Sequence, residues 1–323
     1  MQVHGGDPAA AMVRFGGTAA DWLDLSTGIN PVPFALPKIP QRAWTVLPMP
    51  GEIAALEACA ADAYGTRAAV LAVAGAQAAI QLIPHIAPVG DARILGPTYA
   101  EHSAALCNAG WRVMEVGDLR ALAGADLAVV VNPNNPDGRR HAPDSLVAMA
   151  ERVGLLVVDE SFVDAEPALS LAPCLTPEVR NIVVQRSFGK FFGLAGLRLG
   201  FVVTGDTLAH RLRAAVGPWQ VSGPGIVVGQ AGLRSRPWQA ETRKRLLQDA
   251  ARLDAAASRT GWTLVGGTLL FRTYETGDAA VAQNRLAEAQ IWSRIFPYSA
   301  GWLRLGLPGN AADWARLERA LSG

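Results

Sequence analysis

The most informative stretch of this chain reads Ser187-Phe188-Gly189-Lys190-Phe191-Phe192-Gly193-Leu194-Ala195-Gly196-Leu197-Arg198-Leu199-Gly200. It places one lysine among glycines and phenylalanines. Apolar surroundings disfavour the charged form of an amine and so favour the neutral, nucleophilic form. Ser187 and Arg198 lie within reach on a glycine-rich turn, where a hydroxyl and a guanidinium could hold a phosphate group. The stretch predicts a reactive lysine beside a phosphate site; the alternative is a surface loop with a chance lysine.

Strands and helices alternate on the N-terminal side of this stretch. Apolar strands are expected at residues 70–73, 93–95, 127–131, 155–158, 181–184 and 199–203, with helices at 77–86, 102–109 and 144–152. Strands that are apolar on both faces and alternate with helices form a largely parallel sheet covered on both sides. We therefore predict an α/β fold.

The composition divides the chain into three regions. Residues 1–50 are rich in Gly and Pro, which is typical of an extended arm, and we assign this arm to the small domain and the active site. Residues 51–225 are predicted to form the large, cofactor-binding domain. Residues 226–323 are more helical, with helices expected at 238–258 and 279–289 and strand-like pieces at 269–271 and 302–305. They predict a small α+β domain.

Several classes of function are excluded by composition. Lys and Arg number 29 against 28 Asp and Glu, so the net charge of +1 gives no reason to expect nucleic-acid binding. Prolines and polar residues interrupt the apolar region 68–89, so no membrane span is expected. The three cysteines are widely spaced, which argues against a disulfide framework or metal site and fits a reducing cytoplasm.

Polar motifs follow three of the predicted strands. Asp159 follows the apolar run 155–158, and an aspartate at such a position is often simply a helix cap. The other two motifs are the turn Asn132-Pro133-Asn134-Asn135-Pro136-Asp137-Gly138 and the strand-to-helix junction Ala74-Gly75-Ala76-Gln77. Backbone N–H groups at such a junction can bind an anion. Ligands of parallel sheets bind beyond the carboxyl ends of the strands, so these motifs are expected at the ligand site.

In this order, over nearly the whole chain, the motifs resemble the fold-type I pyridoxal-phosphate enzymes related to aspartate and histidinol-phosphate aminotransferase. The resemblance implies the aspartate-aminotransferase fold, with a seven-stranded type of sheet in the large domain, a homodimer and pyridoxal 5'-phosphate as cofactor. Lys190 would form the Schiff base with the cofactor and later carry a proton. Asp159 would keep the pyridine nitrogen protonated, so that the ring withdraws electrons from the substrate Cα.

The resemblance also implies the remaining cofactor contacts. Tyr99 would stack on the pyridine ring, unless it is simply a core tyrosine, and Asn135 would donate to the phenolic oxygen. The phosphate contacts would be Gly75, Ala76, Gln77, Ser187 and Arg198.

Three positions depart from the family pattern. Phe162 stands where relatives usually place a tyrosine that bonds the phenolic oxygen. Leu47-Pro48 stands where many relatives reach into the partner subunit with Tyr-Pro, which weakens the expectation of a homodimer. Asp137 replaces the usual threonine of the turn, and we assign it no role.

Two late arginines suggest how a substrate is held. The segment Trp302-Leu303-Arg304-Leu305-Gly306 resembles the strand whose arginine binds the substrate α-carboxylate, which a planar guanidinium suits. Arg294 would bind a second anionic group, or would form an ordinary surface ion pair.

The N-terminal arm is similar to the start of the cobalamin-pathway L-threonine-O-3-phosphate decarboxylases, in His4-Gly5-Gly6-Asp7 and in residues 22–31. By this resemblance His4, Ser26 and Arg294 are candidates for the substrate phosphate, although Thr27-Gly28 replaces an Ala-Asn pair that is frequent there. The implied reaction is decarboxylation of L-threonine O-3-phosphate to (R)-1-amino-2-propanol O-2-phosphate in cobalamin biosynthesis. The alternatives are a histidinol-phosphate-like aminotransferase and a cofactor-binding regulator without catalysis.

Overall fold

The computed structural model describes residues 5–322, and the chain divides into two compact units. The large unit comprises residues 34–135 and 139–239; the small unit comprises the chain up to residue 33, residues 136–138 and the chain from residue 240. The predicted boundaries were residues 50 and 225. The difference arises because α9 (Gly223–Arg234) packs against α2 (Arg42–Thr45) and α3 (Pro50–Tyr64), which keeps residues 34–50 and 226–239 in the large unit.

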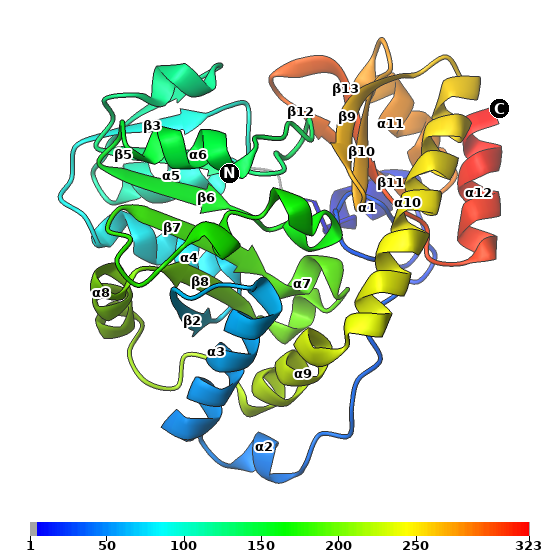
Figure 1. Ribbon diagram of the computed structural model, residues 1–323. Coiled ribbons are helices and arrows are strands. Elements are labelled where there is room, and N and C mark those ends of the chain that lie inside the picture. The colour runs from blue at the N-terminus through cyan, green and yellow to red at the C-terminus, as the bar shows by residue number, and fades with distance from the viewer. Residues whose placement is uncertain (1–4, 323) are drawn as a thin grey trace. The chain divides into compact units, whose positions relative to one another are not determined.

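Within residues 5–322, seven strands of the large unit form one sheet in the order β2-β8-β7-β6-β5-β3-β4 (Figure 1). These strands are β2 (Ala69–Val73), β3 (Asp91–Leu95), β4 (Arg112–Val116), β5 (Leu127–Val131), β6 (Leu155–Asp159), β7 (Ile182–Ser187) and β8 (Gly200–Thr204). β8 is antiparallel to both neighbours, and the strands from β7 to β4 are parallel. The predicted α/β class and mostly parallel sheet are confirmed.

Helices connect and cover these strands. The further α-helices of the large unit are α4 (Ala76–Leu82), α5 (Glu101–Asn108), α6 (Pro143–Ala150), α7 (Phe188–Phe191) and α8 (Asp206–Val216). Short 3-10 helices are η1 (Ile83–His85), η2 (Leu119–Leu122), η3 (Val163–Ala165), η4 (Pro167–Leu169), η5 (Ala172–Cys174) and η6 (Ala195–Leu197).

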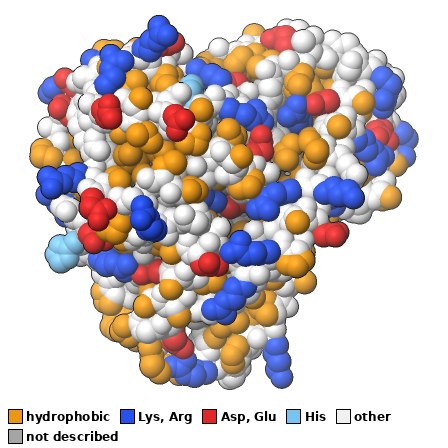
Figure 2. All heavy atoms as spheres, in the orientation of Figure 1, with side chains coloured by type: hydrophobic (Ala, Val, Ile, Leu, Met, Phe, Trp, Pro, Cys, Tyr) orange, Lys and Arg blue, Asp and Glu red, His pale blue; other side chains and the backbone are white. Residues whose placement is uncertain are grey.

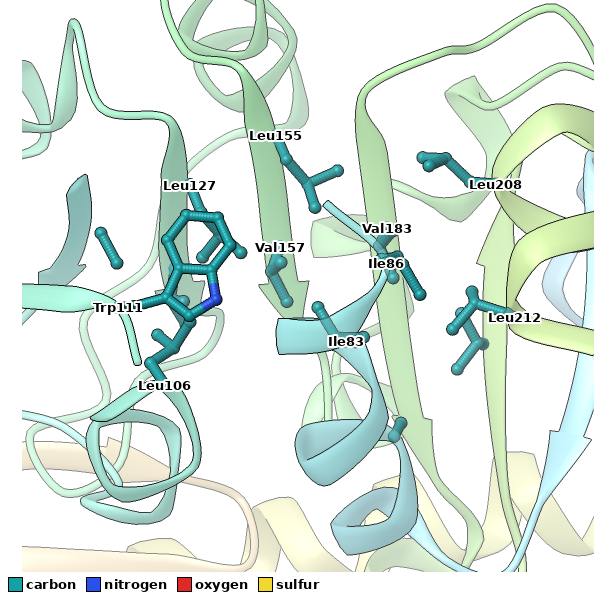
Figure 3. Close-up of a cluster of buried hydrophobic side chains, with 14 of the residues drawn as sticks. Ile83, Ile86, Leu106, Trp111, Leu127, Leu155, Val157, Val183, Leu208 and Leu212 are labelled. Carbon is teal, nitrogen blue, oxygen red and sulfur yellow. The ribbon is translucent and has the colours of Figure 1, made fainter. Parts of the chain in front are cut away.

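One apolar core lies between the sheet and the layer of α4, α5 and α8. Figure 3 shows Leu155 and Val157 of β6 together with Ile83 and Ile86, which follow α4. Alternate residues of a strand point to the same face, so Asp159 at the end of β6 lies on the face of Val157. The core therefore continues directly up to the polar end of β6.

The edge strand β4 was not predicted from the sequence. Arg112, Met114 and Glu115 are exposed, and Val113 and Val116 are only partly buried. A strand with so little burial lacks the apolar run by which the inner strands were recognised. The strand-like piece at 269–271 was also misplaced, because Leu269 and Leu270 form the hairpin turn between two strands of the small unit.

The small unit has its own sheet. Among the described residues, four antiparallel strands follow the order β12-β13-β10-β9, and a parallel pair joins β1 and β11. The strands are β1 (Leu23–Asp24), β9 (Thr263–Thr268), β10 (Phe271–Glu275), β11 (Ile291–Trp292), β12 (Arg294–Phe296) and β13 (Ser299–Gly306). The helices are α1 (Ala9–Phe15), α10 (Arg236–Arg259), which begins in the large unit, α11 (Ala279–Glu288) and α12 (Ala311–Ser322).

Helix α10 is fixed to this sheet by one carboxylate. Arg272 donates to both oxygens of Asp254 at 2.9 and 2.7 Å, and the Tyr274 hydroxyl donates to the same carboxylate at 2.7 Å. The apolar side of the helix carries Leu246 and Leu253, which are fully buried and lie two turns apart.

The surface carries charges of both signs. Lys and Arg side chains lie among Asp and Glu side chains on the face drawn in Figure 2. None of the helices in residues 5–322 has both the length and the hydropathy needed to cross a membrane.

Two neighbouring leucines of α10 give a matched test of this packing. Leu246 is 0% exposed and Leu247 is 60% exposed. Leu246→Ala removes buried methyl groups and should lower the free energy of unfolding by about 2–5 kcal/mol. Leu247→Ala should change it by no more than about 0.5 kcal/mol. Urea denaturation of both variants checks the difference, and equal losses would contradict the packing described here.

Candidate active site

The predicted cofactor residues follow strand ends along one edge of the large sheet. β2, β3, β5, β6 and β7 all finish at this edge, and the antiparallel β8 begins there. In chain order these ends lead to Gly75, Tyr99, Asn135, Asp159 and Lys190. The sheet thus brings to one edge residues that are far apart in the sequence, as the strand-end rule predicts.

Asp159 is buried and hydrogen-bonded through both oxygens. Its Oδ1 accepts from the Ser161 backbone N–H at 2.9 Å and from the Ser161 hydroxyl at 2.5 Å, and its Oδ2 lies 2.9 Å from Nε2 of His102. Burial alone would raise the pKa of this carboxyl, but the hydrogen bonds from His102 and Ser161 outweigh burial, so the pKa lies below its ordinary value. Asp159 is therefore a carboxylate, as a partner of a protonated ring nitrogen must be.

His102 was not assigned a role from the sequence. It lies in the first turn of α5 with 3% of its surface exposed, and its ring meets that of Tyr99 edge to face at a centroid distance of 6.3 Å. Because a carboxylate only accepts, Nε2 of a neutral His102 carries the proton in the bond to Asp159. The available signal was the position of His102, which follows the predicted stacking residue Tyr99 by three residues.

The Arg198 guanidinium and the backbone at the start of α4 lie close together and form a cradle of N–H groups. Gly75 has a left-handed φ of +83°, and a Cβ built on it would lie 2.7 Å from the Arg198 guanidinium. A Cβ on Gly200 would lie 2.7 Å from the backbone nitrogen of Ala76. Glycine at both positions lets the guanidinium and these backbone amides approach each other. Arg198 itself has a φ of +54°, which is unusual for a residue other than glycine and is often found at functional sites.

The side chain of Gln77 ties the cradle to Tyr99. Its Nε2 donates to Glu101 at 2.9 Å, and the Tyr99 hydroxyl lies 3.5 Å from its Oε1. One N–H and the oxygen of the Gln77 side-chain amide are thus engaged with Glu101 and Tyr99.

Asn134 fixes the two segments that carry Tyr99 and Asn135. Its Oδ1 accepts from the Thr98 hydroxyl at 2.6 Å, and its Nδ2 donates to the Pro97 carbonyl at 2.9 Å. The Asn134 side chain therefore ties the segment that carries Tyr99 to the turn that carries Asn135.

Lys190 lies in α7, directly after Ser187 ends β7. It is half-buried, and its Nζ lies 5.7 Å from the ring centroid of the buried Phe162. The residue that replaces the family tyrosine is thus a neighbour of the lysine and offers it an apolar ring without a hydroxyl.

A second buried network lies on the other face of the same strand ends. Glu160 is fully buried, lies 3.2 Å from the Arg186 guanidinium and accepts from the Ser170 hydroxyl at 2.7 Å. Arg186 also bonds Asp164 and covers the Tyr64 ring at 4.0 Å. Burial raises the pKa of Glu160 in spite of Arg186. Because Glu160 and Arg186 adjoin Asp159 and Ser187 in sequence, this network holds both strand ends in place.

In the small unit, Arg294 and Arg304 stand directly opposite each other on β12 and β13. Arg304 is 6% exposed, and burial together with Arg294 lowers its pKa to about 10. Like charges in opposite positions of a sheet destabilise it. An anion bound between or beside them would relieve that repulsion.

Ser26, a predicted contact of the substrate phosphate, is hydrogen-bonded within the small unit. Its hydroxyl donates to Asp24 at 2.5 Å and accepts from the Gly6 N–H at 2.7 Å, so its only proton is already used. Its carbonyl accepts from the Arg304 guanidinium at 2.5 Å. Ser26 thus positions Arg304, and His4 lies outside the described residues.

These residues fit pyridoxal phosphate as the resemblance predicts. Asp159 supplies a carboxylate, Arg198 and the adjoining glycines a phosphate cradle, and Lys190 an amine beside an apolar ring. Within residues 5–322, no three His, Cys, Asp or Glu side chains gather as a metal site would require.

Two relatives cover nearly the whole chain. It is 46% identical over 330 residues to a threonine-phosphate decarboxylase from a Sinorhizobium species, covering 99% of this chain and 97% of that protein. It is 45% identical to the threonine-phosphate decarboxylase of Pseudomonas aeruginosa, covering 100% of this chain and 98% of that protein.

A solved structure shows the same fold. The histidinol-phosphate aminotransferase of Sinorhizobium meliloti, in complex with pyridoxal-5'-phosphate, has a TM-score of 0.85 at 21% identity and covers 99% of this chain and 95% of its own. The predicted fold is thereby confirmed. Residues 20–321 match the family described as aminotransferase class I and II, and the chain belongs to that family.

Proposed function

We propose that this chain catalyses the pyridoxal-phosphate-dependent decarboxylation of L-threonine O-3-phosphate to (R)-1-amino-2-propanol O-2-phosphate. The structural observation that carries the proposal is the opposed pair Arg294 and Arg304, which suits a substrate with two anionic groups. The names of the two relatives at 45–46% identity support the same substrate and reaction. The cobalamin pathway indicated by the N-terminal arm is part of the proposal.

The large unit would hold the cofactor. Arg198, Ser187 and the backbone N–H groups of Ala76 and Gln77 would bind its phosphate, with Gly75 leaving room for Arg198. Tyr99 would stack on its ring and Asn135 would donate to its phenolic oxygen. When bound, pyridoxal phosphate accepts the electron pair that carbon dioxide leaves at Cα.

Three side chains of this chain would act in the chemical step. Asp159, held as a carboxylate by His102 and Ser161, would keep the proton on the ring nitrogen. Arg304 would fix the substrate carboxylate so that the bond to be broken is correctly aligned, which decides the reaction. Lys190 would return a proton to Cα.

The substrate phosphate would be bound by Arg294 and by His4, and Ser26 would contribute by fixing Arg304 through its carbonyl. Arg304 suits the carboxylate because its planar guanidinium matches the two carboxylate oxygens.

We also propose a cytoplasmic homodimer. Trp44, Leu47, Met49 and Trp219 are large apolar side chains exposed on the large unit, as an interface between subunits would need. The three cysteines are all unpaired, which fits a reducing compartment.

The first prediction concerns the lysine. The chain contains three lysines, Lys38, Lys190 and Lys244. Borohydride should reduce the cofactor onto Lys190 alone, because only this amine lies at the strand-end site. Peptide mass spectrometry locates the adduct: Lys190→Ala should lose it and Lys244→Ala should keep it. An adduct on Lys38 or Lys244 in the unaltered protein would refute the assignment.

The second prediction concerns Asp159. Asp159→Ala should still bind the cofactor, more weakly, and should lose about 10²–10³-fold in kcat, since the charge opposite the ring nitrogen is gone. Asp144, exposed on α6, offers a control, and Asp144→Asn should leave kcat unchanged. Steady-state kinetics of both variants are the measurement. Near-normal turnover of Asp159→Ala would show that Asp159 is only a structural cap.

The third prediction separates decarboxylation from transamination. Incubation with L-threonine O-3-phosphate and no keto acid should release carbon dioxide over many turnovers, because decarboxylation returns the cofactor as the aldehyde. Threonine without phosphate should be a poorer substrate by more than about tenfold, since a charge-assisted contact contributes ~1.5–3 kcal/mol. Arg294→Gln should reduce this preference.

A different outcome would favour the alternative activity. If no carbon dioxide is released, and amino groups exchange between histidinol phosphate and 2-oxoglutarate, the chain is an aminotransferase. If neither reaction occurs although the cofactor is bound, the non-catalytic regulator remains.

A further inference from the structure

A small cavity lies beside the carboxylate site of the large unit. It has about 10 Å³ of free volume, close to the least that one water molecule needs. Its two polar lining side chains are Gln185 and His102, and the others are apolar. The apolar lining residues are Ile80, Ile83, Pro84, Leu106, Leu127, Val129 and Val157.

Gln185 is the unexplained residue of this cavity. It is 0% exposed, and within residues 5–322 neither atom of its amide has a hydrogen-bond partner. Its main chain is satisfied, since the Gln185 carbonyl accepts from the Glu160 N–H at 2.9 Å. A buried amide that forms no hydrogen bond is costly and rare in folded proteins, so a ligand for this side chain is expected.

The register of the sheet places Gln185 next to Asp159. The two residues are direct partners on the parallel strands β7 and β6, one strand spacing apart and on the same face. The two side chains form no hydrogen bond with each other. His102 lines the cavity and is hydrogen-bonded to Asp159, so it can connect the two residues.

His102 offers the second end of the link. Its Nε2 donates to Asp159, so the other ring nitrogen, Nδ1, is an acceptor in the neutral ring. A water molecule in the cavity can accept from the Gln185 amide and donate to this nitrogen. Two polar partners of this kind are what an internal water requires.

We propose that one water molecule occupies this cavity and joins the Gln185 amide to Nδ1 of His102, which makes Gln185 a positioning residue for Asp159. The chain of donors runs from Gln185 through the water and His102 to the carboxylate. It holds the proton on Nε2 and turns that proton toward Asp159. The consequence for catalysis rests on the proposed function; the water itself does not.

Three substitutions test the link. Gln185→Leu removes the amide at similar volume, and Val129→Ile keeps the amide but fills the cavity with one methyl group. Val183→Ile is the matched control, because Val183 lies on the same strand and core face as Gln185 but does not line the cavity.

The primary readout needs neither cofactor nor substrate. A high-resolution crystal structure of the unaltered protein should show one water within hydrogen-bonding distance of Gln185 and His102. In ¹⁵N spectra, assigned with His102→Gln, Nδ1 of His102 should have the shift of a bonded acceptor. Gln185→Leu and Val129→Ile should move it toward the shift of an unbonded nitrogen, and Val183→Ile should not. A dry cavity, or an unmoved Nδ1 signal in both test variants, would overturn the inference.

The second readout is kinetic. Gln185→Leu and Val129→Ile should each lower kcat of the holoenzyme by about 3- to 10-fold, the equivalent of one neutral hydrogen bond, with KM little changed. Val183→Ile should keep kcat. Equal losses in all three variants would point to core packing and contradict the proposal. If the ¹⁵N shifts move but no carbon dioxide is formed by any protein, the water link stands and the proposed reaction fails.

Discussion

A carboxylate buried at the end of a strand can remain ionised only if hydrogen bonds replace its lost water, and Asp159 meets this condition through Ser161 and His102. Ser161 is local, two residues further along the chain. His102 comes from another helix, so its bond forms only when α5 packs on the sheet. The charge on Asp159 therefore depends on the tertiary structure of the large unit. The apolar core beneath β6 supports that charge because it holds α5, and with it His102, against the sheet.

Glu160, the next residue, is a second buried acid and lies on the opposite face of the sheet. Glu160 points away from Asp159 because side chains alternate along a strand, and its partners are Arg186, Ser170 and the backbone N–H of Leu171. Breaking a buried ion pair costs several kcal/mol, about 3–5. Two adjacent acids with separate partner sets thus fix the end of β6 on both faces, and the bond between Glu160 and Arg186 ties the end of β7 to it. These strand ends carry Asp159 and lead to Lys190.

The inner strands and the strand-end motifs could be predicted because both are local in sequence: an apolar run followed by a polar turn. β4 could not, since an exposed edge strand has no such run. His102 and Gln185 could not either. Their importance comes from lying beside Asp159, and that adjacency is set by helix packing and by the register of β6 with β7. The two compact units are divided at other residues than the predicted domains, because only packing shows that α9 belongs with α3.

The opposed arginines of the small unit add a consequence for the proposed reaction. Without a ligand, the register of β12 and β13 sets two positive charges against each other, and burial disfavours the charge on Arg304 further. A substrate with a carboxylate and a phosphate gives each arginine a partner. Decarboxylation removes one of those anions and leaves the other. In the proposed reaction Arg304 thus loses its anion while the charge of Arg294 stays opposite it, so the unit would bind the product less tightly than the substrate, and the chemical step itself would favour release.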